Sequence, residues 1–91
     1  MLFVKADRKM EKLGFEKIEE NKFGVSYRKE NKEYNFTQRI DIVHKSSENH
    51  LIQSYVEGTN SDGFNNCVGL TYAEMKAVMK KYRELKRKYR W

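Results

Sequence analysis

Five basic residues near the end of the chain are the side chains best suited to binding a ligand. They follow one another at spacings of four, three, four and three, and we call them the basic row: Lys76, Lys80, Arg83, Arg87 and Arg90. On an α-helix this spacing places them on one side, where several cations can engage successive phosphates of a nucleic acid. The alternative is a solvated face, because Lys and Arg favour helices and suit the negative end of the helix dipole.

The net charge of the chain is concentrated in the same segment. The protein has 91 residues and a formal net charge of +6. Residues 1–70 hold equal numbers of basic and acidic residues, whereas residues 71–91 hold eight Lys or Arg against Glu74 and Glu84. Attraction to a polyanion depends on the local potential rather than on the average charge. We therefore predict a binding module whose last helix contacts nucleic acid.

Two histidines and one cysteine could serve in metal binding or catalysis. His44 and His50 flank residues 45–49, so they could face one another across a hairpin. Asp41 would lie on the other face of its strand, which leaves two of the three protein ligands that a catalytic zinc needs. We prefer surface histidines beside a turn. Cys67 lacks a nucleophile signature and an orienting third group, so we expect a half-buried thiol beneath a loop.

The stretch 58–69 superficially matches a calcium-binding loop. Asn60, Asp62, Gly63 and Asn66 stand at suitable offsets, but glycines replace the acidic anchors at the first and twelfth positions. The phosphate-loop pattern is also absent. We therefore predict a turn-forming connection, with no metal and no cofactor. Enzymatic activity is not expected, because no acid, base and nucleophile converge on a recognisable spacing.

The elements that must position these residues are two helices and a set of strands. Apolar residues recur at helical spacing over residues 3–13, and Gly14 is suited to ending that helix, with Phe15 folding back onto it. Residues 15–57 alternate with a period of two and contain Asn-rich reversals, which predicts an antiparallel meander of three or four strands. Two of these strands have an inward face of alternating apolar residues: Phe23, Val25 and Tyr27 in one, and Phe36, Ile40 and Ile42 in the other. The inward face of residues 51–56 stays open.

The last helix is the most clearly marked element. Thr71 and Glu74 form a capping box, in which each side chain bonds the backbone N–H of the other residue. A stripe along the helix should pack on the sheet, formed by Tyr72, Met75, Val78, Met79, Tyr82, Leu85 and Tyr89. The basic row would then line one shoulder of the packed helix, with Lys81 and Lys88 on the opposite shoulder. Trp91 either closes the core, which we prefer, or presents its ring to a partner.

Length and composition limit the number of domains and the cellular location that the sequence allows. A chain of 91 residues suits a single α+β domain over residues 1–91. Its apolar runs are too short for a membrane span or a signal peptide, and a lone cysteine indicates a reducing compartment, so we expect a cytoplasmic protein that does not bind membranes. Such a small core also favours oligomerisation, which makes a protein partner or a homodimer, through a strand edge or Trp91, our alternative function.

Some stretches resemble small uncharacterised proteins encoded by phages and prophages of Gram-positive bacteria. They are Lys12–Ile18, Gln38–Val43 and Leu70–Val78, the last continuing to Arg83–Leu85. This resemblance implies a compact α+β protein without an assigned activity, and it transfers no functional residues. The order helix, meander, basic helix is also similar to that of double-stranded-RNA-binding domains. Those domains carry a lysine cluster at the start of the last helix, where this chain has Lys76 alone.

Overall fold

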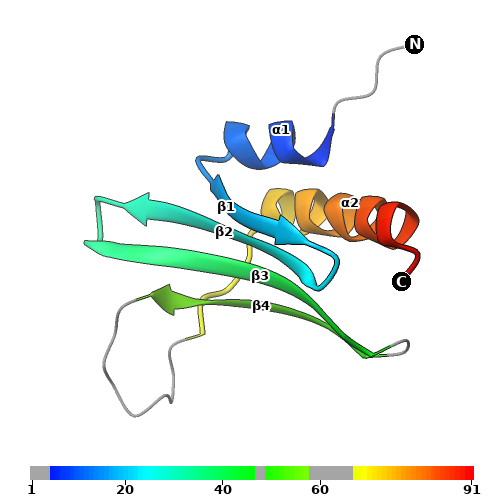
Figure 1. The fold of residues 1–91 in the computed structure, drawn as a ribbon. Coiled ribbons are helices and arrows are strands. Elements are labelled where there is room, and N and C mark those ends of the chain that lie inside the picture. Colours follow the sequence, from blue (N-terminus) through cyan, green and yellow to red (C-terminus); the bar gives the residue numbers. More distant parts are fainter. Residues whose placement is uncertain (1–4, 47–48, 58–66) are drawn as a thin grey trace.

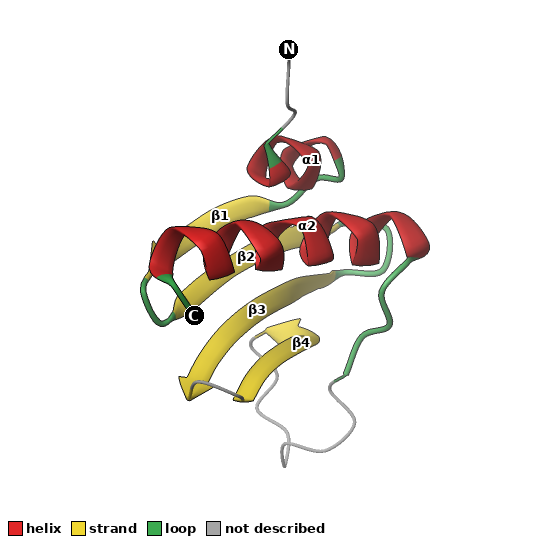
Figure 2. Cartoon of the chain, turned by 90° about the vertical axis from the view of Figure 1, so that its right-hand side faces the viewer, coloured by secondary structure: helices red, strands yellow, loops and turns green. Residues whose placement is uncertain are grey.

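Helix, four strands and helix follow one another in the computed structural model, which describes residues 5–46, 49–57 and 67–91. The elements are α1 (Ala6–Lys12), β1 (Glu16–Asn21), β2 (Gly24–Asn31), β3 (Phe36–Ser46), β4 (Asn49–Glu57) and α2 (Tyr72–Tyr89). Consecutive strands pair antiparallel in the order β1-β2-β3-β4. Both helices lie on one face of this sheet, and β4 is the strand farthest from α2 (Figures 1 and 2). The predicted α+β class is confirmed, with four strands. Neither helix has the length and apolarity to cross a membrane.

Gly14 ends α1 as the sequence predicts. Its φ is 97°, a left-handed conformation that glycine adopts without a Cβ penalty. The N–H of Phe15 donates to Met10 O at 3.0 Å and that of Gly14 donates to Glu11 O at 2.9 Å, which is the Schellman pattern. Phe15 and Met10 are both buried in the core. The helix begins at Ala6. Residues 3–4, which are predicted to form its first positions, lie outside the described residues.

The core lies between the sheet and the two helices. Val25 pairs with Ile42 and Tyr27 pairs with Ile40, so these side chains share the face toward the helices. Nine of the buried apolar residues among those described form one cluster: Met10, Phe15, Val25, Tyr27, Ile40, Ile42, Ala77, Val78 and Leu85. Four of the inward residues predicted for β2 and β3 are therefore confirmed. The pairing of Ile42 with Ile52 places the even-numbered residues of β4 on the same face.

Phe23 does not join the inward face, so that part of the prediction is wrong. Its side chain is 62% exposed. Asn21 pairs with Gly24, and Asn21 Oδ1 accepts a hydrogen bond from the Phe23 N–H at 2.7 Å. Lys22 and Phe23 thus form the loop between β1 and β2, and the strand alternation starts only after this loop.

Gly24 is required by the close approach of β2 to β3. Its φ is 147°, and a Cβ built there would lie 2.1 Å from Ile42 O. We expect Gly24→Ala to lower the free energy of unfolding by about 3 kcal/mol or more, because the backbone must shift to admit a methyl group. Urea denaturation measures the loss. Gly69 is the matched control, since a Cβ there meets nothing within 4 Å, and Gly69→Ala should change stability by less than about 0.5 kcal/mol. Equal effects of the two substitutions would contradict this account.

The capping box of α2 is confirmed, but the buried side of the helix differs from the predicted stripe. Thr71 Oγ1 accepts from the Glu74 N–H at 3.1 Å, and Glu74 Oε1 accepts from the Thr71 N–H at 2.9 Å. The buried residues of α2 are Glu74, Ala77, Val78, Lys81 and Leu85. Tyr72, Met75 and Met79 are 75%, 49% and 37% exposed, so their assignment to the stripe is wrong. The helix is rotated about its axis because it packs against α1 as well as against the sheet.

A group of charged side chains holds α2 in this rotation. Glu20 on β1 accepts hydrogen bonds from Lys17 Nζ at 3.1 Å, Lys81 Nζ at 2.6 Å and Lys88 Nζ at 2.8 Å. Asp7 on α1 lies 2.8 Å from Lys17 Nζ and 3.0 Å from Lys81 Nζ. We call these five residues the carboxylate cluster. Lys81 is 4% exposed, which corrects the prediction that it lies on the shoulder of the helix opposite the basic row.

The pKa of Glu20 reflects this environment. Burial by itself raises the pKa of the carboxyl group, but the hydrogen bonds from Lys81, Lys88 and Lys17 outweigh burial and hold the pKa well below its ordinary value of 4.5. The pKa of Asp7 is also lowered from 3.8: burial opposes this shift, and hydrogen bonds from Lys17, Tyr27 and Lys81 produce it. The ionised forms therefore stabilise the fold above about pH 4.5, and this stability is lost as the pH falls.

We expect Glu20→Gln to destabilise the protein by about 3 kcal/mol, because it leaves the buried ammonium of Lys81 without its closest partner. The variant should also lose less stability than the wild type between pH 5 and pH 3, since Glu20 no longer takes up a proton on unfolding. Thermal and urea unfolding across this pH range measure both effects. Glu19→Gln is the control, because Glu19 is exposed on the same strand. A pH dependence that is the same in the Glu20 variant and the wild type would rule out this role of the cluster.

Candidate nucleic-acid interface

The basic row lies nearly opposite the buried residues of α2. At 100° per residue, the five cations centre about 155° from Glu74, Ala77, Val78, Lys81 and Leu85. Lys76, Arg83, Arg87 and Arg90 are exposed, and Lys80 is half-buried. The row therefore points away from the sheet. The prediction that it lines a shoulder beside a sheet edge is wrong, because the helix is rotated from the expected position.

The cations of the row are not neutralised by carboxylates of the described residues. No ion pair within 4.0 Å joins any of the five to a described Asp or Glu. Both acidic residues of α2 are bonded elsewhere: Glu74 closes the capping box and lies 3.2 Å from Lys29 Nζ, and Glu84 Oε2 accepts from the Ala6 N–H at 2.9 Å. By contrast, Lys81 and Lys88 are paired with Glu20. The positive charge of α2 is thus presented on its outward side.

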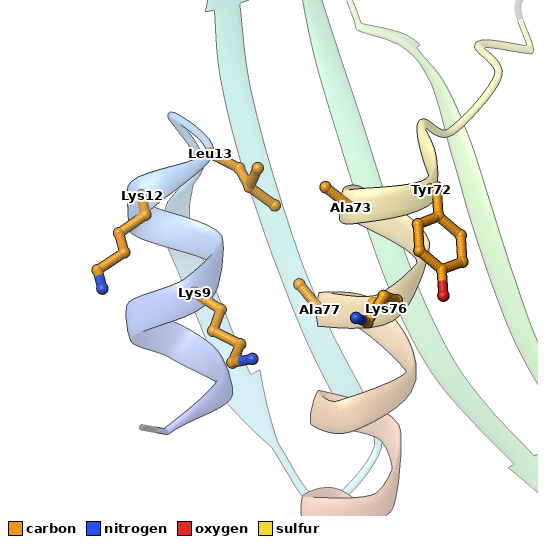
Figure 3. A pocket seen from close by; sticks show the side chains of 7 residues that line it. All are labelled: Lys9, Lys12, Leu13, Tyr72, Ala73, Lys76 and Ala77. Carbon is orange, nitrogen blue, oxygen red and sulfur yellow. The ribbon is translucent and has the colours of Figure 1, made fainter. Parts of the chain in front are cut away.

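The first helix adds cations to the start of the row. A cleft of about 410 Å³ lies between α1 and α2, and we call it the helix cleft. Its lining residues are Lys9, Lys12, Leu13, Tyr72, Ala73, Lys76 and Ala77. Figure 3 shows Lys9 and Lys76 on the two sides of the gap, with Leu13, Ala73 and Ala77 between the helices. Lys12 also lines the cleft, but its side chain extends away from α2, so Lys76 belongs both to the basic row and to a pair of lysines, with Lys9, across the gap (Figure 3).

The sequence prediction missed this contribution of α1. Lys9 and Lys12 are three residues apart, so they share one side of α1, whereas Asp7 and Glu11 lie on the other. This separation of charge can be recognised in the sequence and indicates a basic side of α1. The sequence does not indicate which side of α1 meets α2, because the orientation of α1 depends on the packing of Ala6 and Met10 against the rest of the core.

The two histidines face one another across the β3–β4 hairpin as predicted, but they are half-buried in an aromatic cluster rather than at the surface. His44 and His50 have ring centroids 5.0 Å apart, and Trp91 stacks on His44 at 4.9 Å. Trp91 Nε1 also donates to Lys22 O at 2.9 Å, and its ring packs against the core, which confirms the preferred role for this residue. The aromatic cluster (His44, His50, Tyr82 and Trp91) thus anchors the end of α2.

His50 contacts Tyr82 in this cluster. Its Nδ1 and the Tyr82 hydroxyl oxygen are 2.5 Å apart. Burial, together with the nearby His44 and Lys86, lowers the pKa of His50 from its ordinary value of 6.5. His44 Nδ1 and His50 Nε2 have no hydrogen-bond partner among the described residues. Within residues 5–46, 49–57 and 67–91, no three side chains of His, Cys, Asp or Glu gather as metal ligands.

Asp41 lies on the sheet face away from the helices, as expected from strand alternation. Its Oδ2 accepts hydrogen bonds from the Tyr55 hydroxyl at 2.7 Å and Gln53 Nε2 at 3.3 Å. Burial and the bond to Asp41 raise the pKa of Tyr55 to about 12, so this hydroxyl stays protonated. Arg39 lies 3.6 Å from Asp41 Oδ1 and also pairs with Glu57 at 2.9 Å. These contacts tie β3 to β4 and serve the structure of the sheet.

Cys67 is exposed, so the prediction of a half-buried thiol is wrong. It forms an isolated antiparallel bridge with Tyr55, and the next N–H, of Val68, donates to Ser54 O at 3.0 Å. These contacts place Cys67 beside the outer edge of β4. The calcium-like positions Asn60, Asp62, Gly63 and Asn66 lie outside the described residues.

Both outer strands of the sheet have features that disfavour pairing with another chain. The register of β1 shifts between Lys17 and Glu19, which leaves Ile18 as a bulge. The edge of β4 is partly occupied by Cys67 and Val68. The strand edges are therefore weaker candidates for an interface than the outward side of α2.

Comparison of the chain with models of protein families, with curated proteins and with solved structures gave no match. The resemblance to phage and prophage proteins therefore stays a prediction. The function has to be inferred from the geometry of the basic row and the helix cleft.

Proposed function

We propose that this protein is a non-enzymatic module that binds nucleic acid through the outward side of α2. The observation that carries the proposal is the sorting of charge on this helix: Lys81 and Lys88 are paired with Glu20, whereas the basic row has no ion pair with a described carboxylate. A cytoplasmic location, expected from the lone cysteine, is part of the proposal.

The dimensions of the basic row suit a phosphate backbone. From Lys76 to Arg90 the helix rises about 21 Å at 1.5 Å per residue. One strand of a nucleic acid places a phosphate every 3.4 Å or so along a duplex axis, so the row matches about six nucleotides. Binding several phosphates at once releases several condensed counterions. The affinity should therefore depend steeply on salt concentration, which a merely solvated helix face would not produce.

We expect Arg83→Gln with Arg87→Gln to reduce the slope of log affinity against log salt concentration by about 1.4 for single strands or 1.8 for duplexes, because two phosphate contacts are lost. Titrations of labelled oligonucleotides at several salt concentrations measure this slope. Both arginines are exposed and bonded to no described carboxylate, so the variant should fold normally.

The matched control is Lys32→Gln with Lys45→Gln. These lysines are exposed near the two ends of β3, and removing them changes the net charge by the same amount. The control should keep the wild-type slope. An equal effect of both variants would mean that only net charge matters, and an unchanged slope in the arginine variant would remove the proposal.

A protein partner or a second copy of the chain is our alternative, in line with the resemblance to phage proteins of unassigned activity. The observation that favours it is the exposure of Met75 and Met79, one turn apart on α2, since flexible methionines are frequent at binding surfaces. Sedimentation over a range of protein concentrations separates the two. Two results together would favour the alternative. The wild type should self-associate whereas the variant Met75→Glu with Met79→Glu does not, and oligonucleotide binding should not depend on salt concentration.

A further inference from the structure

We infer that the nucleic acid is single-stranded, with one phosphate bound in the helix cleft and the adjacent base stacked on Tyr72. This inference rests on the proposed function and names its substrate class. It joins two features of the same place in the fold: a cluster of lysines without carboxylate partners and an aromatic ring that stands in solvent.

The helix cleft has the size and charge of a phosphate site. Its volume of about 410 Å³ is within the range of small-ligand pockets. Its lining residues include Lys9, Lys12 and Lys76 but no acidic residue. None of the three ammonium groups has an ion pair with a carboxylate in the described part of the chain. A bound phosphate would neutralise Lys9 and Lys76, and the small side chains of Ala73 and Ala77 leave room for it between the helices (Figure 3).

Tyr72 is a large aromatic residue that lies mostly in solvent. The residue is 75% exposed at the first position of α2, immediately after the capping residue Thr71. Lys76 Nζ lies 5.3 Å from the centre of the ring. A cation beside an exposed aromatic ring is the arrangement in which proteins stack an unpaired base while holding the neighbouring phosphate. The bases of a duplex are stacked on each other, so this ring favours a single strand.

The cleft and the row form one continuous path. Lys76 lines the cleft and is also the first residue of the basic row. A strand that lies along Lys80, Arg83 and Arg87 therefore reaches the cleft at the N-terminal end of α2, where the helix dipole adds positive potential. The path runs over one side of one helix and needs no groove wide enough for a duplex.

The test uses fluorescence anisotropy to measure how tightly the protein binds three labelled probes. The probes are a short oligothymidine, an abasic strand of the same length and a duplex. We expect the oligothymidine to bind more tightly than the duplex. Tyr72→Ala should weaken binding of the oligothymidine at least about fivefold, whereas Tyr72→Phe should bind within about twofold of the wild type because it keeps the ring. On the abasic strand, Tyr72→Ala should have no effect. An oligouridine probe identifies the sugar, and comparable or tighter binding of it also supports the inference.

Tyr34→Ala is the matched control, because Tyr34 is 70% exposed in the turn between β2 and β3. It should bind every probe like the wild type. Lys9→Gln with Lys12→Gln should lower the salt slope for the single strand by about 0.7, the value for the one phosphate bound in the cleft.

The results separate the two levels of the proposal. Absence of salt-dependent binding to any probe would overturn both the proposed function and this inference. If binding depends on Arg83 and Arg87 but the duplex is preferred, or if Tyr72→Ala binds the single strand like the wild type, the proposed function stands and the inference is wrong. An unchanged salt slope in the Lys9 and Lys12 variant would show that the cleft holds no phosphate, which also overturns the inference.

Discussion

The carboxylate of Glu20 accepts hydrogen bonds from three lysines and from the Tyr89 hydroxyl at 3.0 Å, and two of those lysines belong to α2. A buried carboxylate is costly without partners, so the arrangement of its donors is tightly constrained. Lys81 can reach Glu20 and Asp7 only if its side of α2 turns toward the sheet and α1. That rotation buries Val78 and Leu85, leaves Met75 and Met79 exposed, and turns the basic row toward solvent. The same contact therefore fixes both the packing of the helix and the location of its free charge.

The elements themselves follow from local chemistry that is visible in the sequence. Gly14 ends α1 through a left-handed residue, and Thr71 with Glu74 starts α2 through a capping box. These signals involve residues a few positions apart, so they do not depend on the rest of the fold. The same holds for Val25 and Tyr27, whose alternation is a property of a single strand. The class and order of the elements could therefore be predicted without knowing how they pack.

The rotation of α2 could not be predicted in the same way. An apolar stripe containing Tyr72, Met75 and Met79 is a reasonable interpretation of helix periodicity, because hydrophobic side chains normally face the core. The observed side instead contains Lys81, whose long apolar stem lies in the interior while its ammonium group meets Glu20, a residue 61 positions away. The periodicity of apolar residues along α2 gives no indication that Lys81 pairs with Glu20. The helix cleft was missed for the same reason, since it depends on how α1 sits beside α2.

The end of the chain has a practical consequence for work in solution. The protein contains one tryptophan, and that tryptophan stacks on His44 at the last residue of the sequence. Its indole emission is therefore an intrinsic optical signal from a single known position, where the end of α2 meets the β3–β4 hairpin. Detachment of this end would move the ring from a half-buried setting into water and shift its spectrum, so local fraying can be followed without attaching a dye.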